Sequence, residues 1–513
     1  MLHYLLRAAK KVVAIGALAV SIILINFNHI YAASLRAGAA KKDITKNPPT
    51  ALVNDPLYAK ALVINDGKTK AVIITLDVVL ITNEFMEETR ARIQKQLKID
   101  GKNVLINASH NHHENGQLVE DYMEKTVQAV KEAYDNMVPV KIGAGAGIEK
   151  RITMNRRLKL KDGKEWTIRR GTPSPPDEIV IGVAEPFDPE IGILRIDRLD
   201  GKPLAVVYNF TGHPYSGVPN RGATACYPGF ASRTIENNLG NGVIALFLQG
   251  AGGDVTPILY KDGNAPRHSE RFGTLLGLST LDALKNIPVK KNTDIQIVKK
   301  SIKLPIRKDI PERIGSLKKQ KELILDYFRG VGCGSHGGGT KLNFKSFFPL
   351  YMKYMMFPQS PSYYSYRYMQ EENTGSDDLE TLDTINRRDI EKYLSNIYKM
   401  EELIKLEANL KFLEEDIPQN PFTVEVMGMK IGEYVLITFP GEVFSQVGLN
   451  IKSRSPYENT YVCGCTNGFI TGDYAPTSDA YDGEAYEVSC TKLAPGWQEI
   501  YENKVMEILD KLK

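Results

Sequence analysis

Three of the eight histidines lie within four positions, in the stretch INASHNHHENG at residues 106–116. Imidazole is the commonest metal ligand among side chains and a frequent general base. This stretch directly follows an apolar run that is typical of a β-strand. Other polar clusters follow similar runs: His213 comes after AVVYNFTG, the segment AGGDVTP after VIALFLQG, and Glu442 after YVLITFP.

Ligands of α/β sheets bind beyond the carboxyl ends of the strands, so we expect these clusters to meet at one rim. Two histidines and a carboxylate match the nitrogen and oxygen ligands of a catalytic zinc ion. The pattern is consistent both with a metal site and with ordinary polar loops. The metallo-β-lactamase motif H-x-H-x-D-H is not present, because Glu114 and Asn115 occupy its Asp and final His positions.

Apolar runs rich in Val and Ile predict strands at 59–66, 70–81 and 103–109, and helical spacing predicts helices at 84–98 and 118–137. Strands that alternate with helices predict an α/β fold, a layered catalytic domain with a mixed sheet. From about 310 to 420, long amphipathic helices flank a Gly-rich and aromatic-rich stretch. We interpret this region as a helical insertion, which either shapes a substrate entrance or forms a surface excursion.

Basic residues precede the apolar run at 12–27, and small residues follow it near Ala33. This layout predicts a signal peptide at residues 1–33, with an uncleaved N-terminal anchor as the alternative. The body, residues 34–513, is then exported (secreted, periplasmic or at the cell surface). Its five cysteines allow one or two disulfides, whose pairing the sequence does not determine. The small net charge of +4, with basic and acidic residues interspersed, argues against nucleic-acid binding.

Five motifs in combination resemble the neutral/alkaline, non-lysosomal ceramidases and their bacterial relatives. ASHNHHENG is similar to the family's S-H-T-H-S-G-P-G stretch, GHPYS to its H-P block, and QGAGGDVTP to its G-D-V-S-P segment. FPGEVFSQVGLNIKSRSP is similar to its P-G-E segment. The C-terminal run TNGFITGDYAPTSDAYDGEAYEV carries two tyrosines spaced like the family's site tyrosines. The likeness extends through most of the predicted exported body.

The resemblance implies a mixed α/β catalytic domain with one zinc ion (Zn2+) per chain. It assigns the zinc ligands to His110, His213, Glu442 and Tyr474. It also implies hydrolysis of an N-acyl amide bond by water activated on zinc. In that chemistry His112 acts as general acid or base, and Arg156 with Tyr486 stabilises the developing oxyanion.

Two departures from the family affect these expectations. Thr256 replaces the serine of G-D-V-S-P, and its extra methyl group favours attack by water over a covalent mechanism. Whether Thr256 is catalytic or only positions substrate stays open. The C-terminal β-sandwich domain of the family's ceramidases is not expected in this chain, which weakens the assignment of ceramide itself.

The leading substrate is therefore ceramide or a related N-acyl lipid, which would bring the protein to a membrane surface. One alternative is an exported amidase or esterase that acts on an acylated sugar, peptide or other non-sphingolipid substrate. Another is a non-catalytic zinc-bearing binding protein. The aromatic stretch FFPLYMKYMMFP suits an acyl chain or packs on the domain. The sequence does not determine the oligomeric state.

Overall fold

The computed structural model describes residues 35–513 apart from short internal segments: 170–174, 176, 258–266, 292, 332–340, 358–372, 377, 416–417, 471–473 and 484. The described chain divides into two compact units. The first unit extends to Ile306 and resumes at Asn420, and the second runs from Arg307 to Gln419. The predicted signal peptide lies outside the described residues.

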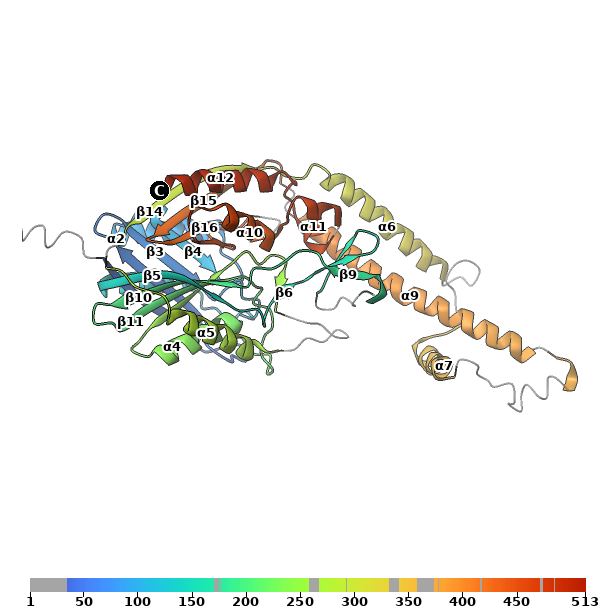
Figure 1. The fold of residues 1–513 in the computed structure, drawn as a ribbon. Helices are drawn as coiled ribbons and strands as arrows, with labels where there is room; N and C mark the ends of the chain where they lie inside the picture. Colours follow the sequence, from blue (N-terminus) through green and yellow to red (C-terminus); the bar gives the residue numbers. More distant parts are fainter. Residues whose placement is uncertain are drawn as a thin grey trace, which may run out of the picture. The chain divides into compact units, whose positions relative to one another are not determined.

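The first unit is built on an eight-stranded mixed sheet (Figure 1). Its strands are, in spatial order, β12 (Ile244–Gln249), β11 (Pro203–Phe210), β10 (Glu190–Arg198), β5 (Val138–Ile148), β1 (Arg36–Asp43), β2 (Tyr58–Asn65), β3 (Lys70–Leu76) and β4 (Val104–Ala108). β3 pairs parallel with β4, and β11 pairs parallel with β12, whereas the other neighbours are antiparallel. The prediction of an α/β fold with a mixed sheet is confirmed.

A second, four-stranded sheet packs on one face of the first. Its order is β14 (Ile295–Leu304), β15 (Phe422–Ile431), β16 (Tyr434–Thr438) and β18 (Asn459–Cys463). Side chains of both sheets form one buried cluster, in which Leu62 and Ile64 of β2 join Tyr434 and Tyr461. Alternate residues of β2, such as Ala61, point into a different cluster under the helices. Successive side chains of a strand point to opposite faces of the sheet, and here the side chains on both faces are mostly apolar. Both faces of β2 are therefore buried.

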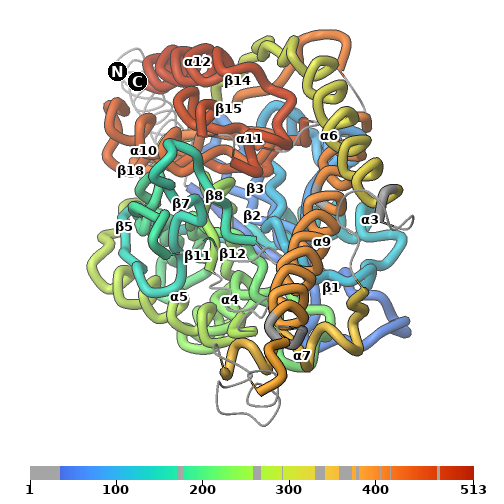
Figure 2. Tube along the Cα trace, turned by 90° about the vertical axis from the view of Figure 1, so that its right-hand side faces the viewer, coloured from blue at the N-terminus to red at the C-terminus, as the bar shows by residue number. Residues whose placement is uncertain are grey.

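Helices cover the outer faces of the two sheets. On the larger sheet these are α2 (Asn83–Leu97), α3 (Tyr122–Asp135), α4 (Cys226–Leu239) and α5 (Ser269–Leu284). Figure 2 shows α4 near β12, and α5 packs on α4 and contacts β5 and β10. α12 (Trp497–Lys511) lies along β14 and β15, and α10 (Ser445–Arg454) contacts β18. The result is a layered arrangement with helices outside and two sheets inside.

A row of buried polar side chains brings β12 next to the opposite edge of the sheet. Lys60 of β2 donates to the carbonyl of Ala245 (2.8 Å), and Thr75 of β3 donates to that of Phe247 (2.7 Å). Asn107 of β4 accepts from the backbone N–H of Gln249 (3.0 Å). The three polar residues are in register across β2, β3 and β4. β12 therefore runs across these strands, and its carboxyl end lies beside that of β4.

Shorter elements surround these carboxyl ends. Two pairs carry polar residues of interest, β6 (Met154–Asn155) with β13 (Val255–Thr256), and β17 (Glu442–Val443) with β19 (Tyr474–Ala475). A three-stranded sheet consists of β7 (Arg157–Leu160), β8 (Glu165–Thr167) and β9 (Val180–Val183). The remaining helices of this unit are η1 (Gly101–Asn103), η2 (Asp177–Ile179), η3 (Asp479–Gly483) and α11 (Tyr486–Cys490).

The second unit is helical. It contains α6 (Ile310–Val331), α7 (Phe344–Met356) and α9 (Asp378–Glu414). α6 and α9 share a small buried cluster, and α7 packs on α9 through Phe347, Tyr354 and Ile390. Much of the Gly-rich and aromatic stretch between α6 and α9 lies outside the described residues.

None of the helices in the described part of the chain is long and apolar enough to span a membrane. The four cysteines within the described part, Cys226, Cys463, Cys465 and Cys490, are all buried and form no disulfide. The fifth, Cys333, lies outside the described residues.

Asp77, which follows β3, should make stability depend on pH. Its buried carboxylate accepts the backbone N–H of Tyr58 at 2.8 Å, and burial raises its pKa to about 6. The folded state therefore binds this proton more tightly than the unfolded chain. The stabilisation is complete below about pH 4 and is lost as the pH rises through about 6, a fall of about 3 kcal/mol in the free energy of unfolding.

Replacing Asp77 by asparagine should remove this contribution. Urea unfolding of both proteins across this pH range provides the measurement, because the difference between the two curves isolates Asp77. If the free energy of unfolding changed with pH in the same way in both proteins, the Asp77 carboxyl would titrate alike in the folded and unfolded states. That result would contradict the prediction.

Candidate metal centre and catalytic site

His110 is held by an unusual backbone conformation directly after β4. Its φ of 61° lies in the left-handed region, which non-glycine residues rarely adopt outside sites that constrain them. Hydrogen bonds on both sides fix this turn, from Ser109 N–H to Leu76 and from Asn111 N–H to Val78. The strand therefore ends before His110, and His110 and His112 meet through this turn rather than by strand alternation.

His110, His213 and Glu442 converge from three different segments: the turn after β4, the loop after β11 and the start of β17. The Nε2 atoms of His110 and His213 are 3.0 Å apart. The Oε2 atom of Glu442 lies 3.2 Å from Nε2 of His110 and 3.4 Å from that of His213. All three side chains are buried. The rim predicted from the sequence is therefore present, and it brings these residues into contact range.

The chemistry of these atoms fits a cation. Nδ1 of His110 lies 2.9 Å from the carbonyl of Val79, and Nδ1 of His213 lies 3.3 Å from that of Gly252. A proton on each Nδ1 would leave two Nε2 lone pairs facing one another, as in metal-binding histidines. Glu442 Oε2 is buried and has no hydrogen-bond partner among the described residues. A cation between these atoms would satisfy all three, so the group could hold a metal ion.

The third histidine of the cluster is His112, which reaches solvent. Its Nε2 lies 3.2 Å from that of His110, and its ring stacks on His213 with 5.2 Å between centroids. The three histidines together have the spacing of a metal-binding group. Desolvation and the neighbouring His110 lower the pKa of His112 well below its usual value. His112 is therefore neutral near pH 7, which leaves one ring nitrogen unprotonated, and Nε2 also lies within reach of a metal in this cluster.

His113 has a different environment. Its ring nitrogen Nε2 lies 2.9 Å from the carbonyl of Tyr215, and its own carbonyl accepts the N–H of Thr224. These contacts tie the histidine loop to the segment after His213. We therefore assign His113 a structural role in this loop.

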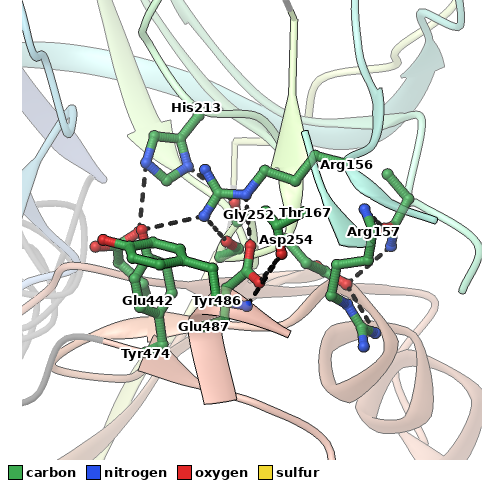
Figure 3. Close-up of polar contacts among 12 residues, drawn as sticks. Arg156, Arg157, Thr167, His213, Gly252, Asp254, Glu442, Tyr474, Tyr486 and Glu487 are labelled. Carbon is green, nitrogen blue, oxygen red and sulfur yellow. Dashed lines mark hydrogen bonds and ion pairs between the residues drawn. The ribbon is translucent and has the colours of Figure 1, made fainter. Parts of the chain in front are cut away.

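Arg156 is buried beside Tyr474. Its Nη2 donates to the hydroxyl of Tyr474 (3.0 Å), as Figure 3 shows. The same atom donates to the carbonyl of Gly253 (2.9 Å). Tyr474 is the register partner of Glu442 in the β17–β19 pair. Arg156 is thus buried against the phenol, where its charge opposes the effect of burial on Tyr474. The pKa of Tyr474 nevertheless stays well above its usual value, because burial dominates.

Glu487, which is not among the predicted site residues, holds Arg156 in place. Its fully buried carboxylate accepts Arg156 Nε at 2.7 Å and the hydroxyl of Thr167 at 2.7 Å (Figure 3). Thr167 also accepts the backbone N–H of Tyr486 (3.3 Å). The only sequence signal for Glu487 is an acidic residue immediately after a predicted site tyrosine.

Tyr486 lies beside this network at the start of α11. Its ring packs edge-on against Tyr474, with centroids 5.7 Å apart, and the guanidinium of Arg169 stacks on its face at 3.3 Å. Burial raises the pKa of Tyr486 far above its usual value, so its hydroxyl stays protonated. Thr256 is buried in β13, where its backbone pairs with Met154. The structure thus groups Tyr486 with Tyr474 and places Thr256 in the strand that follows Asp254.

Asp254 links segments of the site that are far apart in the sequence. Its Oδ1 accepts the N–H of Ser445, and its Oδ2 accepts Asn155 Nδ2 (2.8 Å) and lies 3.4 Å from Arg157. The backbone carbonyl of Asp254 accepts the N–H of Arg156 (2.9 Å). One carboxylate therefore joins the segments that carry Arg156 and Glu442.

Gly253 packs directly against the strand that carries Glu442. A methyl group at this position would overlap the carbonyl oxygen of Glu442. We expect Gly253→Ala to lower the free energy of unfolding by about 2 kcal/mol and to weaken metal binding. Gly315→Ala is a matched control, because Gly315 lies in α6 with no atom near its added methyl group, and should stabilise the protein by up to about 1 kcal/mol. Thermal unfolding with and without zinc measures both effects; equal behaviour of the two variants would contradict this packing argument.

No protein-family model and no curated protein matches this sequence. Solved structures do match: a crystal structure of neutral ceramidase from Pseudomonas aeruginosa superposes with a TM-score of 0.59 at 16% identity, over 94% of this chain and 74% of the ceramidase chain. The chain has the neutral ceramidase fold. A ceramidase complexed with C2 gives the same result, with a TM-score of 0.58, 15% identity and coverage of 94% and 75%. The fold predicted from the five motifs is thereby confirmed.

Proposed function

We propose that the protein is a zinc-dependent hydrolase that cleaves the N-acyl amide bond of ceramide or a related N-acyl lipid. The observation that carries this proposal is the buried Glu442 oxygen without a hydrogen-bond partner, which faces the Nε2 atoms of His110 and His213. The neutral ceramidase fold supports the choice of reaction, since the two matching structures are ceramidases.

His110, His213, Glu442 and Tyr474 would hold the zinc ion. Two neutral imidazoles and one carboxylate suit catalytic zinc, with the phenol as a further ligand. Bound zinc supplies a Lewis acid that lowers the pKa of water to about 7 and polarises a carbonyl group. The carbonyls of Val79 and Gly252 orient the two imidazoles for this task.

His112, Arg156 and Tyr486 would act on the amide group itself, by proton transfer and by stabilising negative charge. His112, neutral and open to solvent, accepts a proton from the attacking water and delivers it to the leaving nitrogen. Arg156 supplies positive charge, and the Tyr486 hydroxyl donates a hydrogen bond, where negative charge develops on the carbonyl oxygen. We assign Thr256 to substrate positioning. We also propose that residues 1–33 direct export of the protein.

The test is hydrolysis of ceramide alongside metal content for the protein that begins at Ser34. We expect release of free fatty acid together with about one zinc per chain. A parallel panel of acylated sugars and peptides identifies the substrate class. Bound zinc with turnover only of the panel would replace the lipid by another acylated substrate. Bound zinc with no turnover would indicate a binding protein, and absence of zinc would contradict the mechanism.

A matched pair of histidine variants tests the proton-transfer role. His112→Gln should keep zinc but lower kcat by about a hundredfold, because the amide cannot exchange a proton near neutral pH. His113→Gln, in the same loop, should leave kcat within about twofold. Loss of zinc from His112→Gln would make His112 a metal ligand instead.

A further inference from the structure

Helix α7 exposes a continuous apolar stripe. Phe344, Phe348, Met352, Met355 and Met356 recur at helical spacing, and their exposed fractions are 74%, 54%, 39%, 62% and 65%. Residues three or four apart lie on the same face of a helix. Large apolar side chains exposed as one contiguous patch indicate a surface that binds another apolar surface.

The stripe does not result from a loosely placed helix, because the opposite face of α7 is anchored. Phe347 stacks on Tyr393 of α9 with 4.3 Å between ring centroids. The hydroxyl of Tyr354 donates to Asp383 at 2.9 Å, and the guanidinium of Arg387 stacks on the Tyr354 ring. An asparagine at 343 caps the helix with a capping box. α7 is therefore apolar on two faces, and among the described residues of the second unit only one of these faces is packed.

The charges of α7 indicate the partner. Its sequence FKSFFPLYMKYMM contains Lys345 and Lys353 and no acidic residue, and Lys341 precedes it. All three lysines are exposed. Helical spacing places Lys345 between Met352 and Met356 around the helix, and Lys353 at the edge of the stripe. Aromatic and methionine side chains flanked by lysines are typical of helices that lie in the interface of an anionic membrane.

We propose that the α7 stripe docks the protein on the surface of an anionic lipid bilayer. Phe344, Phe348 and Met355 would enter the acyl boundary while Lys345 and Lys353 contact phosphate groups. The inference rests on the proposed function in one respect only: a membrane-bound N-acyl lipid gives the docking its purpose. From Phe344 to Met356 the stripe extends for about 18 Å, enough to contact several lipid headgroups.

The experiment measures sedimentation of the chain from Ser34 with vesicles. One set contains equal parts of phosphatidylcholine and phosphatidylglycerol, and the other contains phosphatidylcholine alone. We expect binding to the anionic vesicles, weakened at least about tenfold by the triple change Phe344→Ser, Phe348→Ser and Met355→Ser. Replacing Lys345 and Lys353 by glutamine should weaken it by about fivefold per lysine, and only on the anionic vesicles.

The matched control is a second triple variant in the same unit, Leu323→Ser, Met400→Ser and Ile404→Ser. These residues are apolar and 63%, 55% and 66% exposed, but they lie on α6 and α9. This variant should bind vesicles as the parent does. Equal loss in both triple variants, or no binding by the parent, would overturn the proposal.

Activity separates this inference from the proposed function. If both hold, the α7 triple variant hydrolyses detergent-dispersed ceramide normally but loses activity on ceramide embedded in vesicles. Hydrolysis of dispersed ceramide by a parent that binds no vesicles overturns the docking surface alone. Vesicle binding that depends on α7, without hydrolysis of any dispersed substrate, supports the docking surface and contradicts the proposed function.

Discussion

Replacing His110 by alanine should abolish both zinc binding and N-acyl hydrolysis. His110 contributes a nitrogen to the centre of the cluster, within 3.0 to 3.2 Å of His213, His112 and Glu442. Without it, the remaining ligands no longer surround a cation, and Glu442 keeps a buried negative charge. We expect zinc content to fall from about one per chain to less than about a tenth, and kcat/KM to fall at least about a thousandfold.

Metal analysis after gel filtration and a fatty-acid release assay measure the two effects. His113→Ala is the control, because it removes an imidazole from the same loop without touching the cluster. It should keep zinc and activity. The metal-centre assignment would be wrong if His110→Ala, still folded by circular dichroism, retained stoichiometric zinc. It would also be wrong if both variants lost zinc alike.

The sequence was sufficient to predict which clusters meet, but not how they meet. Polar segments that follow apolar strands pointed to His110, His213 and Glu442, because strand ends are where an α/β sheet exposes loops. The left-handed backbone at His110 was not predictable, since it is maintained by hydrogen bonds to the loop after β3.

Local sequence patterns could not predict the order of the strands in the sheet either. β4 and β12 lie at opposite edges of the eight-stranded sheet, yet their carboxyl ends are adjacent. Lys60, Thr75 and Asn107 cause this proximity by binding the free edge of β12. Each is a polar residue in an otherwise apolar strand, which is the signal that a reader of the sequence could have used. Buried polar groups need partners, so such residues mark a neighbouring backbone.

Glu487 is the site residue whose role only the tertiary structure reveals, and its replacement by glutamine should have the second-largest effect. The variant keeps the shape but removes the charge that pairs with Arg156. A buried Arg156 without its counter-charge should lower the free energy of unfolding by about 3 kcal/mol. The Arg156 guanidinium should also move away from the Tyr474 hydroxyl, which it contacts at 3.0 Å. We therefore expect kcat to fall between about tenfold and a hundredfold while zinc is retained and KM changes little.

Glu165→Gln is the control that separates an effect of Glu487 on the position of Arg156 from an effect on the free energy of unfolding. Glu165 pairs with buried Arg157 at 2.5 Å, just as Glu487 pairs with Arg156, but Arg157 does not contact the site tyrosines among the described residues. Arg157 keeps Glu185 at 2.6 Å and Asp254 at 3.4 Å as counter-charges, so this control should lose less stability than Glu487→Gln and keep kcat within about twofold. Steady-state kinetics at a temperature where both variants are folded give the comparison. If the two variants lowered kcat equally, Glu487 would be only structural. If Glu487→Gln alone lowers kcat, the carboxylate acts on the reaction through the position of Arg156, because Glu487 itself contacts Arg156 and Thr167 rather than the metal-binding group.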